Sequence, residues 1–564
     1  MEALDWLVIG VFFLALIGII VWVVRQKQND SADYFLGGRD ATWLAIGASI
    51  FASNIGSEHL IGLAGAGASS GMAMAHWEIQ GWMILILGWV FVPFYTRSMV
   101  YTMPEFLERR YNPQSRTILS VISLVSYVLT KVAVTVYAGG LVFQQVFGIK
   151  ELWGIDFFWI AAIGLVVLTA IYTIFGGMKS VLYTSVLQTP ILLLGSLIIL
   201  VLGFKELGGW DEMMRVCGAV TVNDYGDTMT NLIRSNDDAN FPWLGALIGS
   251  AIIGFWYWCT DQFIVQRVLS GKNEMEARRG TIFGAYLKLL PVFLFLIPGM
   301  IAFALHQKYI GAGGEGFLPM LANGTANADA AFPTLVAKLL PAGVKGLVVC
   351  GILAALMSSL ASLFNSSAML FTIDFYKRFK PETPEKKLVG IGQIATIVIV
   401  VLGILWIPIM RSVGDVLYTY LQDVQSVLAP GIAAAFLLGI CWKRTSAQGG
   451  MWGLISGMVI GLTRLGAKVY YSNAGEVADS TFKYLFYDMN WLFFCGWMFL
   501  FCIIVVIVVS LATEAPTAEK IQGLVFGTAT KEQKAATRAS WNHWDIIHTV
   551  IILSITAAFY WYFW

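Results

Sequence analysis

The amino-acid sequence predicts an all-α integral membrane protein with about 14 transmembrane helices. Of its 564 residues, 58% are hydrophobic and only 13% are charged, about half the roughly 25% expected of a soluble chain. The 56 glycines suit the close packing of helices in a bilayer. Long apolar runs recur along the whole chain. Membrane lipid is therefore the expected surrounding, and a formal net charge of +1 gives no reason to expect a nucleic-acid partner.

Each predicted span is an apolar run that can be compared with the roughly 20 residues needed to cross the hydrocarbon core of a bilayer. The first run follows Met1 and Glu2, is long and lacks a small-residue cleavage site, so we expect a retained helix and not a signal peptide. The predicted spans cover residues 4–24, 42–70, 72–96, 117–147, 155–175, 180–203, 242–268, 280–306, 342–371, 388–410, 413–441, 448–471, 487–512 and 544–563.

Lysine and arginine residues in the connections predict the orientation. With the N-terminus outside, the cytoplasmic connections hold about twice as many of these residues as the external ones. We therefore expect both termini to be extracytoplasmic, in a plasma membrane or, in a prokaryote, the inner membrane. The long external connections are then 204–241 and 307–341, residues 1–41 form an additional helix with a cytoplasmic linker, and residues 442–564 hold three C-terminal helices.

Two spans are interrupted by polar residues at mid-membrane depth. Residues 53–59 interrupt the second span, and residues 257–262 interrupt the seventh. The interruptions lie about 200 residues apart, and each opens a group of five spans, 42–203 and 242–441. Because five is odd, the second group starts from the opposite face of the membrane. Inverted groups that begin with a broken helix are typical of secondary transporters, which bind their substrate between the repeats.

A sodium site can be assembled from oxygen atoms on two spans. Ala355, Ser358 and Ser359 share one helical face, and a break in the second span would free the carbonyls of Ala52 and Ile55. Na⁺ is a hard cation that takes oxygen ligands, and unwound backbone supplies them within a membrane. Paired serines in a membrane helix more often bond to their own backbone or pack against another helix, so this structural role is the alternative at this point.

Polar and aromatic side chains within the spans also form a group suited to a sugar. A ring of hydroxyls donates and accepts hydrogen bonds, so carboxylate, amide and cationic groups around an apolar ring face are expected to hold it. Alternatives remain, because a lone histidine or aromatic residue is often a packing residue, and Lys288 could pair with Glu78 or Asp261. The candidates are Asn54, His59, Glu78, Tyr257, Trp258, Lys288 and Gln422.

Longer motifs resemble those of a known family. They are GASIFASNIGSEHLIGLAGAG at residues 47–67, WYWCTDQFIVQR at 256–267 and LMSSLASLFNS at 356–366. From about residue 30 to its end, the chain resembles the sodium/solute symporter family and, within it, the sodium/glucose cotransporter branch. This resemblance implies a LeuT-like 5+5 inverted-repeat core made of the second to eleventh spans, with one helix before it and three after it.

The resemblance also implies roles for individual residues. Tyr257 matches an aromatic gate that closes over the sugar from the cytoplasmic side, and Trp77 occupies an aromatic position near the outer gate. The implied sodium ligands are the carbonyls of Ala52, Ile55 and Ala355 and the hydroxyls of Ser358 and Ser359. The implied sugar contacts are Asn54, His59, Glu78, Lys288 and Gln422, and Trp258 on the seventh span is a further candidate by its residue type.

Four positions depart from the pattern of the branch. Ser185 occupies a position near the sodium exit where the branch usually has an Asp. Ala361 occupies a position where members that bind two sodium ions have a Thr. The loss of both oxygen groups argues against a second sodium site. Gly254 and Gly81 lack side chains at two positions neighbouring the sugar contacts, so the identity of the sugar stays open.

These features predict a sodium-coupled symporter that imports a neutral hexose of the glucose or galactose type by alternating access. The expected partners are a small sugar or polyol, sodium ion and membrane lipid, with no cofactor besides Na⁺ as the co-transported ion. An enzyme is not expected, because the sequence has no HExxH motif and no cluster of His and Cys. The alternatives are a sodium symporter for another small solute, such as myo-inositol, and a non-transporting sugar sensor.

Overall fold

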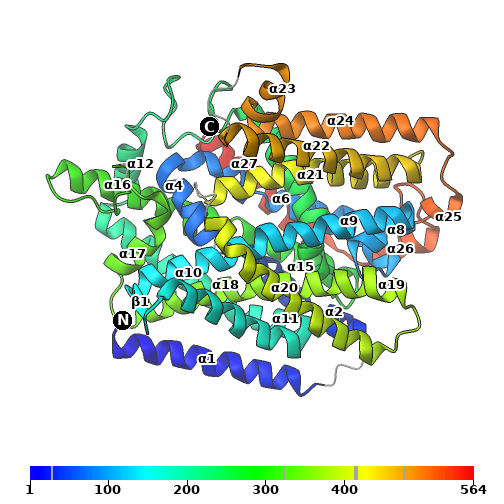
Figure 1. Cartoon of the computed structure of the whole chain (residues 1–564), viewed down its shortest axis with the longest axis horizontal. Coiled ribbons are helices and arrows are strands. Elements are labelled where there is room, and N and C mark those ends of the chain that lie inside the picture. The colour runs from blue at the N-terminus through cyan, green and yellow to red at the C-terminus, as the bar shows by residue number, and fades with distance from the viewer. Residues whose placement is uncertain (27–29, 57, 322–323, 412–416, 474–477) are drawn as a thin grey trace.

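The computed structural model describes residues 1–26, 30–56, 58–321, 324–411, 417–473 and 478–564 (Figure 1). The longer helices are α1 (Ala3–Val24), α3 (Trp43–Asn54), α9 (Pro113–Ser126), α10 (Ala133–Phe147), α11 (Phe157–Leu207), α13 (Trp243–Gly254), α15 (Glu274–Lys288), α16 (Ile297–Gly311), α18 (Val344–Met369), α20 (Glu385–Arg411), α21 (Leu417–Cys441), α22 (Ala447–Asn473), α24 (Trp491–Ala512) and α27 (His543–Tyr562).

Shorter elements connect and interrupt these helices. The short α-helices are α2 (Ser31–Leu36), α4 (Ala64–Ser70), α5 (Ala75–Glu78), α6 (Gly81–Ile86), α7 (Val92–Ser98), α8 (Met103–Arg110), α12 (Trp210–Gly218), α14 (Gln262–Leu269), α17 (Ala331–Leu339), α19 (Lys377–Phe379), α23 (Thr481–Lys483), α25 (Ala518–Ile521) and α26 (Lys531–Ala539). The π-helical turns are η2 (Glu58–Leu63), η4 (Leu87–Phe91), η5 (Tyr127–Val132), η6 (Phe255–Thr260), η7 (Val292–Leu296), η9 (Leu370–Tyr376) and η10 (Tyr484–Asp488). The 3₁₀ turns are η1 (Gly37–Arg39), η3 (Gly71–Met74) and η8 (Ala328–Ala330), and the antiparallel strands β1 (Glu151–Leu152) and β2 (Ile155–Asp156) form a hairpin.

The described chain contains ten helical segments that are long and apolar enough to cross a membrane, so the predicted count of fourteen is not confirmed. Part of the difference arises because a helical segment that continues through a bend is counted once, even where it contains two predicted spans. The 51 residues of α11 would extend more than twice the roughly 30 Å of a hydrocarbon core. Gly177 breaks its helical conformation with φ +53°, between the predicted spans 155–175 and 180–203. A side chain at Gly177 would collide with the backbone of Tyr34.

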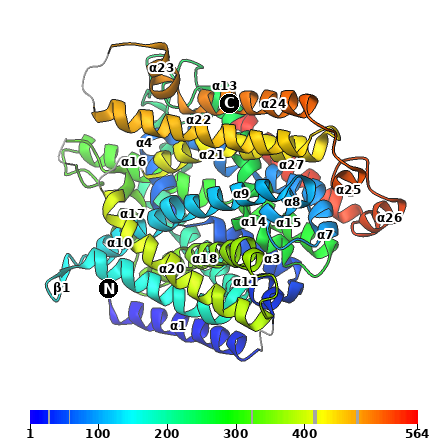
Figure 2. The same ribbon diagram turned by 45° about the vertical axis from the view of Figure 1, so that its right-hand side comes forward.

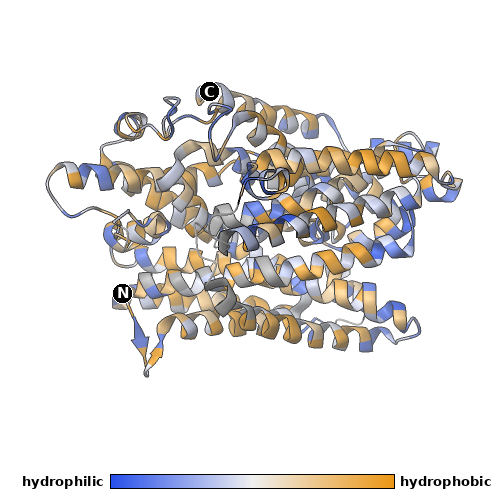
Figure 3. Ribbon diagram, turned by 45° about the horizontal axis from the view of Figure 1, so that its top comes forward, coloured by the Kyte–Doolittle hydropathy of each residue, from blue (hydrophilic) through white to orange (hydrophobic). Residues whose placement is uncertain are grey.

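The helices surround a core formed by α3, α11, α15 and α18, of which α18 is buried along most of its length. Figure 2 shows α1 along one edge of this bundle and α22 and α24 along the opposite edge. Orange, hydrophobic residues dominate the long helices in Figure 3, and blue, hydrophilic residues gather at their ends and in the connections. This distribution is the one expected of a protein whose helices face lipid.

The first helix, α1, is tied to the N-terminal end of α18. The carboxylate of Asp5 accepts hydrogen bonds from the backbone N–H groups of Gly343, at 2.7 Å, and Gly346, at 2.8 Å. Gly346 has no room for a side chain, because a Cβ would lie 2.7 Å from the backbone of Asp5. Asp5 therefore satisfies N–H groups at the start of α18 that lack partners within that helix.

Both interruptions predicted from the sequence are present. Helix α3 ends at Asn54, because Ile55 adopts an extended conformation with φ −81° and ψ 106°, and the chain continues as the π-helical turn η2. The seventh span changes from α13 to the π-helical turn η6, and Asp261 is extended before α14 begins. Such turns leave backbone groups and side chains directed away from regular helical positions, and they occur frequently at functional sites.

Candidate functional site

A buried cavity lies where several helices end or break. Asn54 is the last residue of α3, Glu78 of α5, Gly254 of α13 and Lys288 of α15. These four residues line the cavity together with Glu58, His59, Trp77, Gln80, Lys131, Val134, Thr135, Ile253, Tyr257, Trp258, Phe263, Ser359, Leu363, Gln422 and Gln425. The interruptions of the second and seventh predicted spans therefore meet at one place.

The cavity is small in this structure. Its free volume is about 50 Å³, and one water molecule needs roughly 10–15 Å³ on the same measure. A few water molecules fit, whereas a six-membered ring with its hydroxyls does not. A ligand of that size must therefore displace side chains that now bond to one another.

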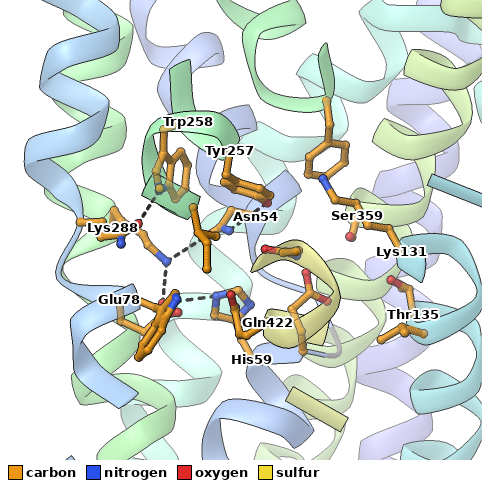
Figure 4. Close-up of a pocket in the computed structure, with 18 of the residues that line it drawn as sticks. Asn54, His59, Glu78, Lys131, Thr135, Tyr257, Trp258, Lys288, Ser359 and Gln422 are labelled. Carbon is orange, nitrogen blue, oxygen red and sulfur yellow. Dashed lines mark hydrogen bonds and ion pairs between the residues drawn. The ribbon is translucent and has the colours of Figure 1, made fainter. Parts of the chain in front are cut away.

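The centre of the cavity is an ion pair between Glu78 and Lys288 (Figure 4). Oε2 of Glu78 lies 2.6 Å from Nζ of Lys288 and 3.3 Å from Nε2 of His59. The same ammonium donates to Oδ1 of Asn54 at 3.1 Å, and Nδ2 of Asn54 donates to the Tyr257 hydroxyl at 3.1 Å. Of the two partners considered for Lys288, the structure selects Glu78 and not Asp261.

A second buried ion pair lies at the edge of the same cavity. Lys131 donates to Oδ2 of Asp261 at 2.6 Å, and the hydroxyl of Tyr127 donates to the other carboxylate oxygen. The Lys131 ammonium also lies 4.6 Å from the ring centre of Tyr257 and 4.5 Å from that of Phe263. Cation–π contacts of this kind help to stabilise a buried ammonium.

Aromatic side chains form the apolar walls of the cavity. The rings of Tyr257 and Trp258 meet edge to face at 4.9 Å, and Lys288 lies 5.3 Å from the ring centre of Trp258. Trp77, the predicted outer-gate residue, lines the cavity and stacks on Trp491 at 5.4 Å. Trp491 belongs to α24, so a C-terminal helix supports this wall.

Gln422 reaches the cavity from α21. Its side chain is buried, and among the described residues its Oε1 accepts no hydrogen bond. Such a carbonyl can accept a hydrogen bond from a ligand hydroxyl.

The five predicted sodium ligands are all buried where α3 and α18 meet. A Cβ at Gly56, just after the break in α3, would lie 3.1 Å from Oγ of Ser359. The hydroxyls of Ser53 and Ser362 also join these two helices, at 2.6 Å. In the described chain, no backbone N–H donates to the carbonyl of Ile55, as expected where the helix is broken. The break and the serine face of α18 therefore adjoin, and Ser359 also lines the cavity.

Five polar residues of the cavity were not among the candidates predicted from the sequence. They are Glu58, Gln80, Lys131, Thr135 and Gln425. Lys131 could have been identified from the sequence, because a lysine deep in an apolar span is functional more often than not. Glu58 lies inside the predicted interruption itself. Gln80 had no signal in its sequence spacing, because its position depends on the end of α5.

The two glycine departures have different explanations. Gly81 faces α15 and does not line the cavity, since a Cβ there would lie 2.9 Å from the carbonyl oxygen of Ala285. Gly254 does line the cavity, next to Gln80. Only Gly254 therefore bears on the shape of the site.

Comparison with known proteins identifies the family. Residues 34–457 match the family model described as the sodium:solute symporter family. The chain belongs to that family. It is 36% identical to the human sodium/myo-inositol cotransporter 2 over 94% of this chain and 79% of the relative. It is also 35% identical to the zebrafish (Danio rerio) sodium/glucose cotransporter 4, over 92% of this chain and 80% of that protein.

A solved structure confirms the fold of this symporter. It is a substrate-bound, outward-open state of a Na⁺-coupled sialic acid symporter, with a TM-score of 0.73. At 22% identity, the match covers 92% of this chain and 99% of the other. The protein is thus a multi-pass membrane transporter of a sodium-coupled family, and this family consists of transporters and not enzymes.

Proposed function

We propose that this symporter couples the inward movement of Na⁺ to that of a neutral, polyhydroxylated six-membered ring by alternating access. The observation that carries the proposal is the cavity at the helix breaks. A carboxylate, an ammonium, an imidazole and two amides, from Glu78, Lys288, His59, Asn54 and Gln422, face one space between aromatic walls. Hydroxyl groups match this mixture, because each can donate and accept.

The proposed architecture places this site between two inverted repeats, residues 42–203 and 242–441, with the N-terminal helix and three C-terminal helices outside them. Residue 57 of the first repeat and residues 322–323 and 412–416 of the second lie outside the described residues. We further propose that both termini are extracytoplasmic, in the plasma membrane or a bacterial inner membrane. The charge distribution of the connections supports this orientation.

The proposed sodium site is formed by the carbonyls of Ala52, Ile55 and Ala355 and the hydroxyls of Ser358 and Ser359. Sodium bound there would join the break in α3 to α18 and favour the conformation in which the solute site is complete. A ligand drives such a transition only through its different affinity for the two states. Inward movement of one charge adds roughly 2.3 kcal/mol per 100 mV of membrane potential.

Two solutes fit the proposal, a glucose- or galactose-type hexose and myo-inositol. Both are uncharged rings of hydroxyls, and the names of the relatives include both solutes. Counterflow of labelled glucose, galactose and myo-inositol in proteoliposomes, with and without sodium, tests the proposal. Sodium-dependent exchange of at least one of the three is expected. Binding without exchange would identify a sugar sensor, and exchange of none of them would contradict the proposed solute class.

Substituting Ser359 by alanine is expected to raise the sodium concentration for half-maximal uptake by about tenfold, because a hydroxyl ligand of a hard cation is lost. Uptake as a function of sodium concentration measures the change. Ser367→Ala is the matched control, since Ser367 is a buried serine of the same helix that lies outside the proposed site. An unchanged sodium dependence in folded Ser359→Ala protein would rule out this ligand.

The number of coupled ions is expected to be one sodium per solute. Ser185 provides a hydroxyl in place of a carboxylate, and it lies 3.3 Å from Ser358 of the first site. Thr184 and Ser362, which could rebuild a second site, already bond to Ser180 and Ser53. Reversal-potential measurements in proteoliposomes distinguish the cases, because two ions would make the equilibrium solute gradient follow the square of the sodium ratio.

A further inference from the structure

Gln80 occupies the space that Gly254 leaves empty in the cavity wall. It lies between α5 and α6 in a non-helical conformation, with φ −87° and ψ 24°. Its side chain is 2% exposed, and a Cβ built on Gly254 would lie 2.5 Å from its Oε1. No carbon atom can approach an amide oxygen so closely. The side chain of Gln80 and any side chain at position 254 are therefore mutually exclusive in this arrangement.

The amide of Gln80 is held in place by two hydrogen bonds. Its Nε2 donates to the carbonyl oxygen of Ser250 at 2.8 Å, and its Oε1 accepts from Nε1 of Trp258 at 3.2 Å. A glutamine amide has two N–H donors and a carbonyl with two lone pairs. Among the described residues, these two bonds use one donor and one lone pair, and the other donor and lone pair are available to a group in the cavity.

We propose that Gln80 contacts the solute and forms a hydrogen bond with a hydroxyl of the ring. Its side chain occupies the space that a side chain at position 254 would otherwise fill. The proposal rests on the symport function proposed above and adds the part of the site that distinguishes one ring from another. If Gln80 only filled space, an apolar side chain would serve as well. Burying an amide whose hydrogen bonds are only partly satisfied instead costs free energy, unless a partner completes those hydrogen bonds.

The position of Gln80 among the other solute contacts supports this assignment. Glu78 and Gln80 lie on either side of the same helix break, and both line the cavity. Trp258, which donates to Gln80, also lies beneath the ammonium of Lys288. A ring hydroxyl that bonds to the amide would therefore fix the ring against the aromatic wall. A donor and acceptor pair at this point selects for the position and configuration of that hydroxyl.

Three variants test the proposal: Gly254→Ser, Gln80→Ala and the two combined. Gly254→Ser alone is expected to lower sodium-dependent uptake by about tenfold or more, because the new side chain collides with Gln80. Gln80→Ala is expected to raise the solute KM by about tenfold and to change the rank order in which glucose, galactose and myo-inositol compete. The double variant, in which the introduced hydroxymethyl side chain has room, is expected to recover most of the uptake with a solute preference unlike that of the wild type.

The sodium concentration for half-maximal uptake is expected to stay within about twofold in Gln80→Ala, since Gln80 is not a proposed sodium ligand. Gln393→Leu is the matched control, because Gln393 also donates to a backbone carbonyl, at 3.1 Å, but lies outside the cavity. Should Gln80→Ala fail to fold, Gln80→Met keeps the volume and removes the amide.

Two results would overturn the assignment. One is a solute KM and rank order in the folded Gln80 variant equal to those of the wild type. The other is Gly254→Ser protein that transports like the wild type. Both require a wild-type protein that exchanges at least one of the three rings. A wild-type protein that exchanges none of them would instead contradict the proposed function, so the two failures are distinguishable.

Discussion

Replacing Lys288 by methionine is expected to reduce sodium-driven solute uptake by roughly a hundredfold and to destabilise the protein. Lys288 is almost fully buried and bonds to both Glu78 and Asn54. Loss of one or two charge-assisted hydrogen bonds from Lys288 to the solute, worth about 1.5–3 kcal/mol each, accounts for the expected reduction in uptake. Removal of one partner of a buried ion pair leaves an uncompensated charge and typically costs about 3–5 kcal/mol of stability.

Uptake in proteoliposomes and the apparent melting temperature in detergent measure the two effects separately. Lys377→Met is the matched control, because Lys377 also pairs with a carboxylate, that of Glu385 at 3.1 Å, but at the exposed surface. Exposed pairs contribute about 0–1 kcal/mol, so the control should retain both stability and uptake.

A double variant, Lys288→Met with Glu78→Gln, is expected to regain much of the lost stability, because no unpaired charge stays buried. It should not regain uptake, since both groups are proposed to contact the solute. Full uptake in either variant would show that the pair is structural and would contradict its role in the site.

Much of the site was predictable because intramembrane polar residues are rare and costly. The interruptions at residues 53–59 and 257–262 were predicted from polar residues within apolar spans, and the structure contains both breaks. The pairing of Lys288 with Glu78 was one of two alternatives, since sequence spacing does not decide which carboxylate of another helix lies nearest. That choice depends on the packing of α15 against its neighbours, which only the three-dimensional structure gives.

Other features could not be predicted, for identifiable physical reasons. Gln80 enters the cavity because α5 ends after Glu78, and nothing in the local residue types marks that end. Gly81 and Gly254 are both glycines beside contact positions, yet one permits close helix packing and the other shapes the cavity. The number of crossings stays a prediction for a similar reason, because apolar runs do not show where a helix bends or continues, as α11 does through Gly177.

Asp261→Asn is expected to lower the stability by about 3–5 kcal/mol, because it leaves the buried ammonium of Lys131 without a carboxylate. Lys131→Met should have a comparable effect from the other side of the pair. Arg109→Met is the control for loss of a cation, because Arg109 pairs with Glu105 at 3.0 Å on the surface with a side chain that is 45% exposed.

The combined variant, Lys131→Met with Asp261→Asn, should be destabilised by less than the sum of the single changes, and the difference is the coupling energy of the pair. A coupling energy below about 0.5 kcal/mol would contradict the ion pair as a unit.

The pair should also affect transport through Tyr257, the proposed gate, since the ring of Tyr257 lies against the Lys131 ammonium. All three variants are therefore expected to lower the maximal rate of uptake more than they raise the solute KM. A change confined to KM would indicate instead that Lys131 contacts the solute directly and does not hold the gate.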